Sequence, residues 1–243
     1  MNSKGDFIIA SPTDFSSNDF AIYKMSGWPD LNQNLLRTVQ YNSLWLSQSA
    51  NFVLTFETQN YVYFVFRESS VEVQTCGGNE EKIYARIARV CKNDQGGQHF
   101  LKDNWTTFLK ARLNCSQGGN YPFYYNEIQS ATWLESKKMV YATFTTPQNS
   151  IGGSAICSFK LDDIQDTFDG SFMTRKGPDS VWKSSKDVDH SHFQCQKSAK
   201  FDIPTSRDYQ LMEKSVPSTL NGPIYTVRFL NKFKISSKHL VTT

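Results

Sequence analysis

The sequence contains no long apolar run and no dense cluster of basic residues. A membrane-spanning helix needs about 18 or more consecutive apolar residues, so we expect no direct insertion of this chain into a bilayer. Residues 1–6 include no apolar segment, so we also expect no secretory signal peptide within the chain. The net charge of +3 is too small to indicate binding to nucleic acid.

Patterns typical of metal, phosphate and catalytic sites are also missing. No CxxC or CxxH pair occurs and no glycine pair opens a predicted helix, so neither a zinc site nor a phosphate cradle is indicated. His190 and His192 precede Cys195, but no fourth ligand is nearby, so we interpret them as a surface loop. The pair Asp162–Asp163 stands at the start of a predicted helix, where negative charge is stabilised. We therefore expect no cofactor, no metal and no enzymatic activity.

Aromatic residues are abundant, at 14% of the chain, with 18 Phe and 11 Tyr. Because aromatic side chains pack well on pleated surfaces, this composition favours a β-rich core. A hydrophobic content of 39% and a charged content of 20% are ordinary for a globular protein. A length of 243 residues corresponds to one large domain or two small ones.

Short β-type runs separated by turn residues recur along the chain and predict an all-β fold. The run Tyr61–Phe66 is apolar at alternate positions on both faces, which predicts a sheet covered on both sides. Leu161–Phe168 has the spacing of one short helix, and Asn34–Ser47 is expected to hold a turn or two. The predicted strands are Asn51–Thr55, Tyr61–Arg67, Ile83–Val90, Thr106–Asn114, Gln129–Trp133, Val140–Thr145 and Ala155–Lys160.

Three arginines, Arg86, Arg89 and Arg112, alternate with apolar neighbours in two of these runs. This alternation predicts strands with one polar face, which is a candidate surface for a partner.

The chain has five cysteines: Cys76, Cys91, Cys115, Cys157 and Cys195. In a reducing compartment they would be buried thiols that act as small hydrophobic groups. In an extracellular protein four of them would form two disulfides, and four cysteines allow three pairings that the sequence alone leaves open.

Two N-x-S/T sequons are present, at Asn104 and Asn114. Asn104 lies in a polar loop and is the better candidate for a glycan. Asn114 directly precedes Cys115, and a disulfide at that cysteine would hinder its modification.

The exact sequences of several segments are more specific for a protein family than these patterns of residue type. Residues 91–97 read CKNDQGG, residues 104–115 read NWTTFLKARLNC, and residues 60–68 read NYVYFVFRE. They are accompanied, in order, by LRTVQY at 36–41, GSAIC at 153–157 and PDSVW at 178–182. Together these motifs resemble the sema domain of semaphorins over about residues 14–225, and they are closer to the semaphorin ligands than to the receptors that share the domain.

The resemblance implies a fold and a disulfide pattern. The expected fold is part of a seven-bladed β-propeller, with about four blades present because a blade with its loops takes about 45 to 60 residues. We expect residues 1–225 to be a partial sema domain and residues 226–243 a divergent tail. The implied disulfides are Cys91–Cys195 and Cys115–Cys157. Cys76 is then left free, bonded to a second chain, or paired outside this sequence.

The resemblance also implies a function. A semaphorin is an extracellular, glycosylated guidance ligand that binds a plexin-type receptor and directs axon guidance and cell migration, and it often acts as a homodimer. The full-length parent protein would be secreted or membrane-anchored. The resemblance does not identify the residues that contact the receptor. The alternatives are a truncated or decoy sema fragment without signalling activity and, as the rival from another class, a propeller-fold glycosidase. The glycosidase would need two carboxylates that converge on a central funnel.

Overall fold

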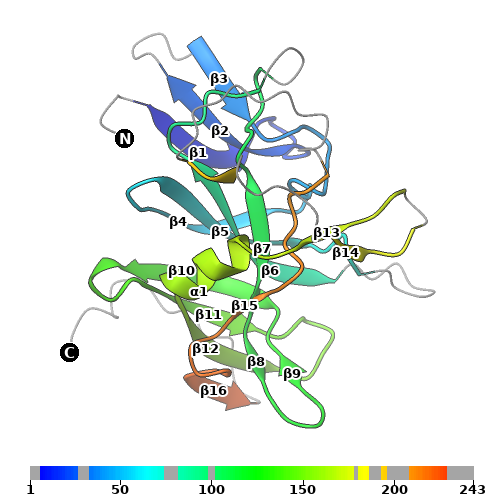
Figure 1. The fold of residues 1–243 in the computed structure, drawn as a ribbon. Coiled ribbons are helices and arrows are strands. Elements are labelled where there is room, and N and C mark those ends of the chain that lie inside the picture. The colour runs from blue at the N-terminus through cyan, green and yellow to red at the C-terminus, as the bar shows by residue number, and fades with distance from the viewer. Residues whose placement is uncertain are drawn as a thin grey trace.

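The computed structural model describes residues 6–26, 33–73, 82–97, 102–177, 180–185, 193–195 and 208–228. These residues form mostly antiparallel sheets, and the one α-helix among them is α1 (Leu161–Phe168). Figure 1 shows the sheets one after another along the molecule, in the order of the chain. The all-β fold predicted from the sequence is confirmed.

The first sheet has the strand order β1-β2-β3, with antiparallel pairing throughout. Its β1–β2 connection, residues 13–19, is a loop closed by Asp14, whose carboxylate accepts the backbone N–H groups of Asn18 and Asp19. The strands are β1 (Phe7–Pro12), β2 (Phe20–Ser26) and β3 (Gln33–Arg37).

The central sheet has the order β15-β7-β6-β5-β4. Strands β4 to β7 are antiparallel neighbours, and the short β15 joins the outer edge in parallel with β7. The strands are β4 (Asn51–Glu57), β5 (Tyr61–Ser69), β6 (Ile83–Cys91), β7 (Leu109–Asn114) and β15 (Val216–Pro217).

The third sheet has the order β10-β11-β12-β16, and a 3₁₀ turn at Glu135–Lys137 connects its first two strands. Its strands are β10 (Glu127–Leu134), β11 (Met139–Thr145), β12 (Gly153–Lys160) and β16 (Tyr225–Arg228). Two small hairpins complete the fold: β8 (Ser116–Gln117) with β9 (Phe123–Tyr124), and β13 (Phe172–Thr174) with β14 (Lys183–Ser185).

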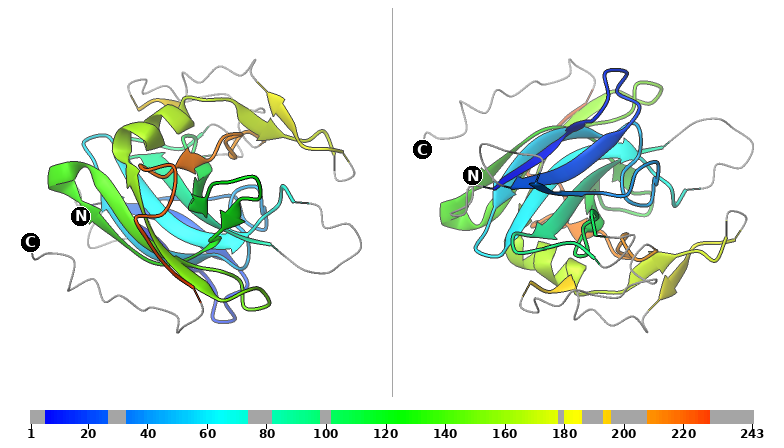
Figure 2. Two further views of the ribbon diagram at one scale, coloured as in Figure 1. Left: turned by 90° about the horizontal axis from the view of Figure 1, so that it is seen from below. Right: turned by 90° about the horizontal axis from the view of Figure 1, so that it is seen from above.

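The three larger sheets stack face to face, as the two views of Figure 2 show. Val62, Phe64 and Phe66 of β5 belong to the apolar core shared with the first sheet. Tyr63 and Val65 belong to the core shared with the third sheet and with α1. The double-sided apolar pattern of β5 therefore produces a sheet covered on both faces, as predicted, and this stacking is that of propeller blades.

Two disulfides fasten the stack. Cys91, at the end of β6, is bonded to Cys195, and Cys115, just after β7, is bonded to Cys157 in β12. The second bond joins the central sheet to the third sheet. These are the two pairs that the resemblance implies.

The predicted strands correspond to β4, β5, β6, β7, β10, β11 and β12, with small shifts at their ends. The largest shift is at β7, which begins at Leu109 rather than Thr106. The N–H groups and hydroxyls of Thr106 and Thr107 bond to the carboxylate of Asp94, so these residues form a loop instead of a ladder.

The predicted helix at Leu161–Phe168 is confirmed with the same bounds. The expected turn within Asn34–Ser47 is present in the second part of the segment, whereas its first part belongs to β3, which pairs with β2. In this turn the carbonyl of Asn42 accepts the N–H groups of Trp45 and Leu46.

Candidate functional site

The β8–β9 hairpin projects from the lower end of the molecule in Figure 1. It follows β7 directly and is held at its base by the Cys115–Cys157 disulfide. The N–H of Tyr125 donates to the carbonyl of Cys115 at 2.9 Å, which closes the base from the other side. The hairpin is thus a short loop on a rigid support, a setting in which binding residues are common.

Aromatic side chains cover this hairpin. Tyr121 is 95% exposed and Tyr124 is 42% exposed. Phe123 packs edge-on against the buried ring of Tyr125, with 5.1 Å between ring centroids. Two exposed tyrosine rings gathered on one short hairpin form a candidate contact surface, because aromatic residues are enriched where proteins bind one another.

Arg112 of β7 makes a cation–π contact with the exposed ring of Tyr124. Its guanidinium lies 3.8 Å from the ring centroid of Tyr84 and 5.3 Å from that of Tyr124, and its Nη2 donates to Oδ1 of Asn126 at 2.9 Å. Burial lowers the pKa of Arg112, but an arginine stays charged at neutral pH. The result is a Tyr–Arg–Tyr stack that connects the hairpin to the central sheet.

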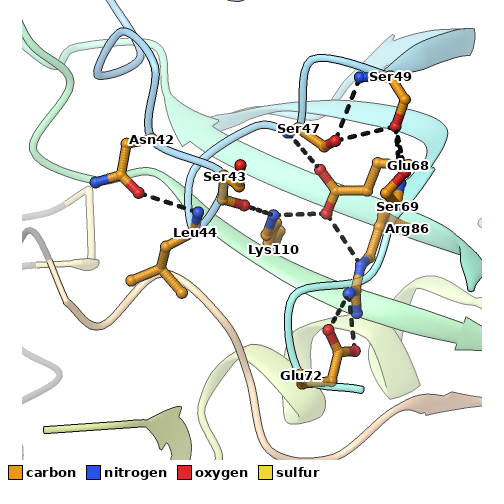
Figure 3. Close-up of polar contacts among 10 residues, drawn as sticks. All are labelled: Asn42, Ser43, Leu44, Ser47, Ser49, Glu68, Ser69, Glu72, Arg86 and Lys110. Atoms are coloured by element: carbon orange, nitrogen blue, oxygen red, sulfur yellow. Dashed lines mark hydrogen bonds and ion pairs between the residues drawn. The ribbon is translucent and has the colours of Figure 1, made fainter. Parts of the chain in front are cut away.

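A cluster of charged side chains is buried inside the same sheet, as Figure 3 shows. Glu68 on β5, Arg86 on β6 and Lys110 on β7 are each fully buried on the face toward the first sheet. Oε1 of Glu68 accepts hydrogen bonds from Nε of Arg86, at 3.2 Å, and from Nζ of Lys110. Nη2 of Arg86 contacts both carboxylate oxygens of Glu72, at 2.7 and 2.6 Å.

The charges of this cluster support one another. Burial alone would raise the pKa of Glu72, but the charge and hydrogen bonds of Arg86 outweigh it and hold that pKa below its ordinary value. Burial would likewise lower the pKa of Arg86, but Glu72 and Glu68 raise it. Lys110 differs, because burial lowers its pKa and Glu68 only partly compensates. The cluster therefore consists of buried charged groups that contact one another directly.

The ion cluster also bonds to the backbone of the segment that contains Ser43 and Ser47. Nζ of Lys110 donates to the carbonyl of Ser43 at 3.1 Å, and Oε2 of Glu68 accepts the N–H of Ser47 at 3.0 Å. Arg86 is the cross-strand neighbour of Arg112 and lies 5.6 Å from the ring of Tyr84. The buried ions, the Tyr–Arg–Tyr stack and the hairpin therefore form one continuous structure.

The prediction that Arg86, Arg89 and Arg112 share one exposed polar strand face is wrong for Arg86 and Arg89, whereas Arg112 is only partly buried and lies against the exposed ring of Tyr124. Arg86 is fully buried in the ion cluster, and Arg89 is buried on the opposite face, between the rings of Tyr61 and Phe168. The alternation was real, but the partners that allow these charges to be buried come from other strands and could not be seen in the local sequence.

The other predicted site residues are scattered. The amide nitrogen of Asn104 donates to the carbonyl of Arg37 at 3.2 Å, and Asn114 ends β7. Asp162 and Asp163 lie in the first turn of α1, as expected. Cys76, His190 and His192 lie outside the described residues.

Sequence reasoning missed Tyr84, Glu72 and Lys110 as parts of the site. The sequence does carry a signal for Tyr121, because the stretch 121–125 reads YPFYY between two turn regions. Within the residues that the structure describes, no three side chains of His, Cys, Asp or Glu group as metal ligands. None of the described helices has the length and apolar character needed to span a membrane.

Face-to-face antiparallel sheets with short loops define part of a β-propeller. The family model described as Sema domain matches residues 124–237. Semaphorin 5c of Drosophila melanogaster is 45% identical over 226 residues, which cover 93% of this chain and 20% of that protein. Mouse Semaphorin-5B is 47% identical over 184 residues, which cover 75% of this chain and 16% of that protein. The chain belongs to the semaphorin family and carries part of its sema domain.

Solved structures agree with the fold. Drosophila Semaphorin 2a superposes with a TM-score of 0.82 and 38% identity, over 91% of this chain and 37% of that one. The structure of Drosophila Plexin A in complex with Semaphorin 1b gives a TM-score of 0.81 and 38% identity, over 95% of this chain and 44% of that one. The chain therefore spans only part of these relatives, from about a fifth of the curated proteins to less than half of the solved chains.

Proposed function

We propose that this chain is the receptor-contacting part of an extracellular semaphorin-type ligand, and that it binds a plexin-type receptor through the β8–β9 hairpin. The observation that carries the proposal is the exposed aromatic hairpin with its Tyr–Arg–Tyr stack. A solved complex of Plexin A with Semaphorin 1b is among the structures that this chain resembles. Such binding would serve axon guidance and cell migration, as in the family.

The hairpin has the physical character of an interface centre. Tyrosine and arginine dominate the binding energy of many protein interfaces, because they bury large surfaces and lose little freedom on binding. Here Tyr124 and Arg112 are already held by stacking, and the disulfide at Cys115 holds the base. A preorganised surface has less entropy to lose when a partner binds, which strengthens association.

The test is an affinity measurement between the full chain and a purified plexin-type ectodomain. Tyr121→Ala/Tyr124→Ala is expected to weaken binding at least about tenfold, because truncating aromatic hot spots costs about 2 kcal/mol or more. Phe15→Ala is the matched control, since Phe15 is a fully exposed aromatic residue on the β1–β2 connection, away from the hairpin. Equal losses in both variants, or no binding by the unmodified chain, would overturn the proposal.

We also propose that the chain is not an enzyme. The buried carboxylates of Glu68 and Glu72 are both bound to Arg86 rather than directed at a cleft. Glycoside hydrolysis needs two carboxyl groups that flank a bound sugar, so this arrangement does not favour the glycosidase alternative.

Several finer features remain proposals. Asn104 and Asn114 are proposed glycan sites, and a sugar on Asn104 would replace one of two amide hydrogens while the other bonds to Arg37. Homodimer formation and an intermolecular role for Cys76 are proposed on the family pattern alone. The domain boundary at residue 225 stays a prediction, and it falls at the first residue of β16.

A further inference from the structure

The two disulfides differ in their access to solvent. Cys115 and Cys157 are 1% and 0% exposed, so the bond between them lies inside the protein. Cys91 is also buried, but its partner Cys195 is partly exposed. A dissolved thiol can therefore reach one sulfur of the Cys91–Cys195 bond in the folded protein, whereas the buried bond becomes reachable only through local unfolding.

The surroundings of the accessible bond can accommodate the reduced state as well. Sγ of Cys195 lies 3.4 Å from the carbonyl oxygen of Asn60, which stands between β4 and β5. Sγ of Cys91 lies 3.9 Å from the carbonyl oxygen of Phe193. A disulfide sulfur has no proton to donate, but a thiol is a weak donor, so each thiol would have an acceptor already in place.

Contacts other than the disulfide hold the two cysteines together. Nδ2 of Asn93, two residues after Cys91, donates to the carbonyl of Cys195 at 2.7 Å. The buried ring of Phe193 packs against Phe172 at the start of β13, with 5.4 Å between ring centroids. Because these contacts do not involve the sulfurs, they keep the two cysteines close after the bond opens, so that the bond can form again.

From this geometry we infer that Cys91–Cys195 is a redox site, which a dithiol reductant opens and an oxidant closes while the other disulfide stays intact. The β8–β9 hairpin keeps its support throughout, because the bond at its base is the buried one. The inference rests on the proposed function only for its extracellular setting, in which disulfides form and persist.

The reduction takes place in two exchange steps. A thiolate of the dithiol attacks Sγ of Cys195 and forms a mixed disulfide, while Cys91 leaves with the electron pair of the broken bond and takes a proton from water. The second thiolate of the reductant then attacks the reductant's own sulfur in the mixed disulfide and releases Cys195, which is protonated in turn. The reductant ends as a disulfide, and its two electrons have passed to the protein.

The experiment applies graded dithiothreitol to the folded full chain carrying Cys76→Ser, in which every remaining cysteine belongs to one of the two bonds. Free thiols are trapped with iodoacetamide and located by peptide mass spectrometry. At the lowest effective concentration, labelling at Cys91–Cys195 is expected to exceed labelling at the buried bond at least about tenfold, because exchange follows access. Equal labelling, earlier labelling of the buried bond, or resistance of both bonds until the chain unfolds would overturn the inference.

Two comparisons separate access from other causes. In urea, where burial is lost, the two bonds should be reduced to within about twofold of each other. A preference that persists in urea would contradict the inference, because it would come from the local sequence and not from the fold. With the monothiol glutathione, the first mixed disulfide should form on Cys195, and glutathione found first on Cys91 would contradict the assigned point of attack.

The reverse reaction tests the contacts that keep the cysteines close. Asn93→Ala is expected to slow re-formation of the bond by glutathione disulfide about threefold, the effect of one surface hydrogen bond. Asn149→Ala, the matched exposed control on the β11–β12 connection, should leave the rate unchanged. Equal rates in the two variants would overturn the role assigned to Asn93.

Receptor binding is a separate readout. The affinity of the selectively reduced chain for a plexin-type ectodomain should stay within about twofold of that of the oxidised chain, because the buried bond still supports the hairpin. A larger loss would overturn the independence of the two bonds. If neither form binds, the receptor proposal fails, while the labelling experiment still decides this inference.

Discussion

The central sheet is buried on both faces, but the two faces differ in chemistry. Toward the third sheet, Phe56 stacks between Tyr63 and Trp133, with centroid distances of 4.9 and 4.5 Å. Toward the first sheet, the apolar row of β5 is continued by Glu68, which bonds Arg86 and Lys110 from the neighbouring strands. The face toward the third sheet is mainly aromatic and apolar, with the guanidinium of Arg89 buried between the rings of Tyr61 and Phe168, and the face toward the first sheet contains a cluster of ions with specific partners.

The two kinds of contact contribute differently to the fold. Apolar packing is non-directional and responds gradually to changes in volume. Buried ion pairs add little net stability, but the loss of one partner is costly because an uncompensated charge stays behind. We therefore interpret the charged face as the one that fixes the positions of the loops and of the hairpin, and the apolar face as the main source of stability.

The largest expected effect is that of Glu68→Gln. This change leaves Lys110 without its carboxylate and should lower the free energy of unfolding by about 3–5 kcal/mol. Ile87→Val, a fully buried change on the apolar face, should cost only about 1 kcal/mol. Urea denaturation of both variants checks the contrast, and similar losses would remove the distinction between the faces.

The second effect concerns the disulfide between the central and third sheets. Cys115→Ser should lower the free energy of unfolding by about 4 kcal/mol in the chain-entropy estimate, because the bond closes a loop of 42 positions. It should also reduce the yield of folded protein, since Cys157 loses its partner. Unchanged denaturation and yield would show that the apolar face holds the sheets together without this bond.

A smaller loss than those of Glu68→Gln and Cys115→Ser is expected for Glu72→Gln, which should cost about 2 kcal/mol at neutral pH. Because the folded-state pKa of Glu72 is below its ordinary value of 4.5, its contribution is present above that pH and is lost as the pH falls through the folded-state pKa. The stability difference between the unmodified chain and the variant should therefore shrink in acid. A difference that stays constant from neutral to acid pH would contradict the ion-pair assignment.

The sequence predicts the sheet that is covered on both sides because its signal is local. The apolar residues at both odd and even positions of Tyr61–Phe66 need no knowledge of the partner to be interpreted. The helix Leu161–Phe168 is predicted for the same reason, since its apolar spacing is contained in eight residues.

The ion cluster could not be predicted in this way. Glu68, Arg86 and Lys110 are on three strands and become neighbours only through the register of the sheet. Taken singly, each looks like a residue that belongs in solvent. The role of Asp94, which holds Thr106 and Thr107 in a loop, was missed for the same reason.

Hydrogen–deuterium exchange of the chain, alone and bound to a plexin-type ectodomain, tests whether the β8–β9 hairpin is the receptor contact. Binding is expected to protect the amides of residues 116–125, in the β8–β9 hairpin, and to leave those of the β1–β2 connection near Phe15 unchanged. If the hairpin amides of the bound chain exchange as fast as those of the free chain, the hairpin is not the receptor contact.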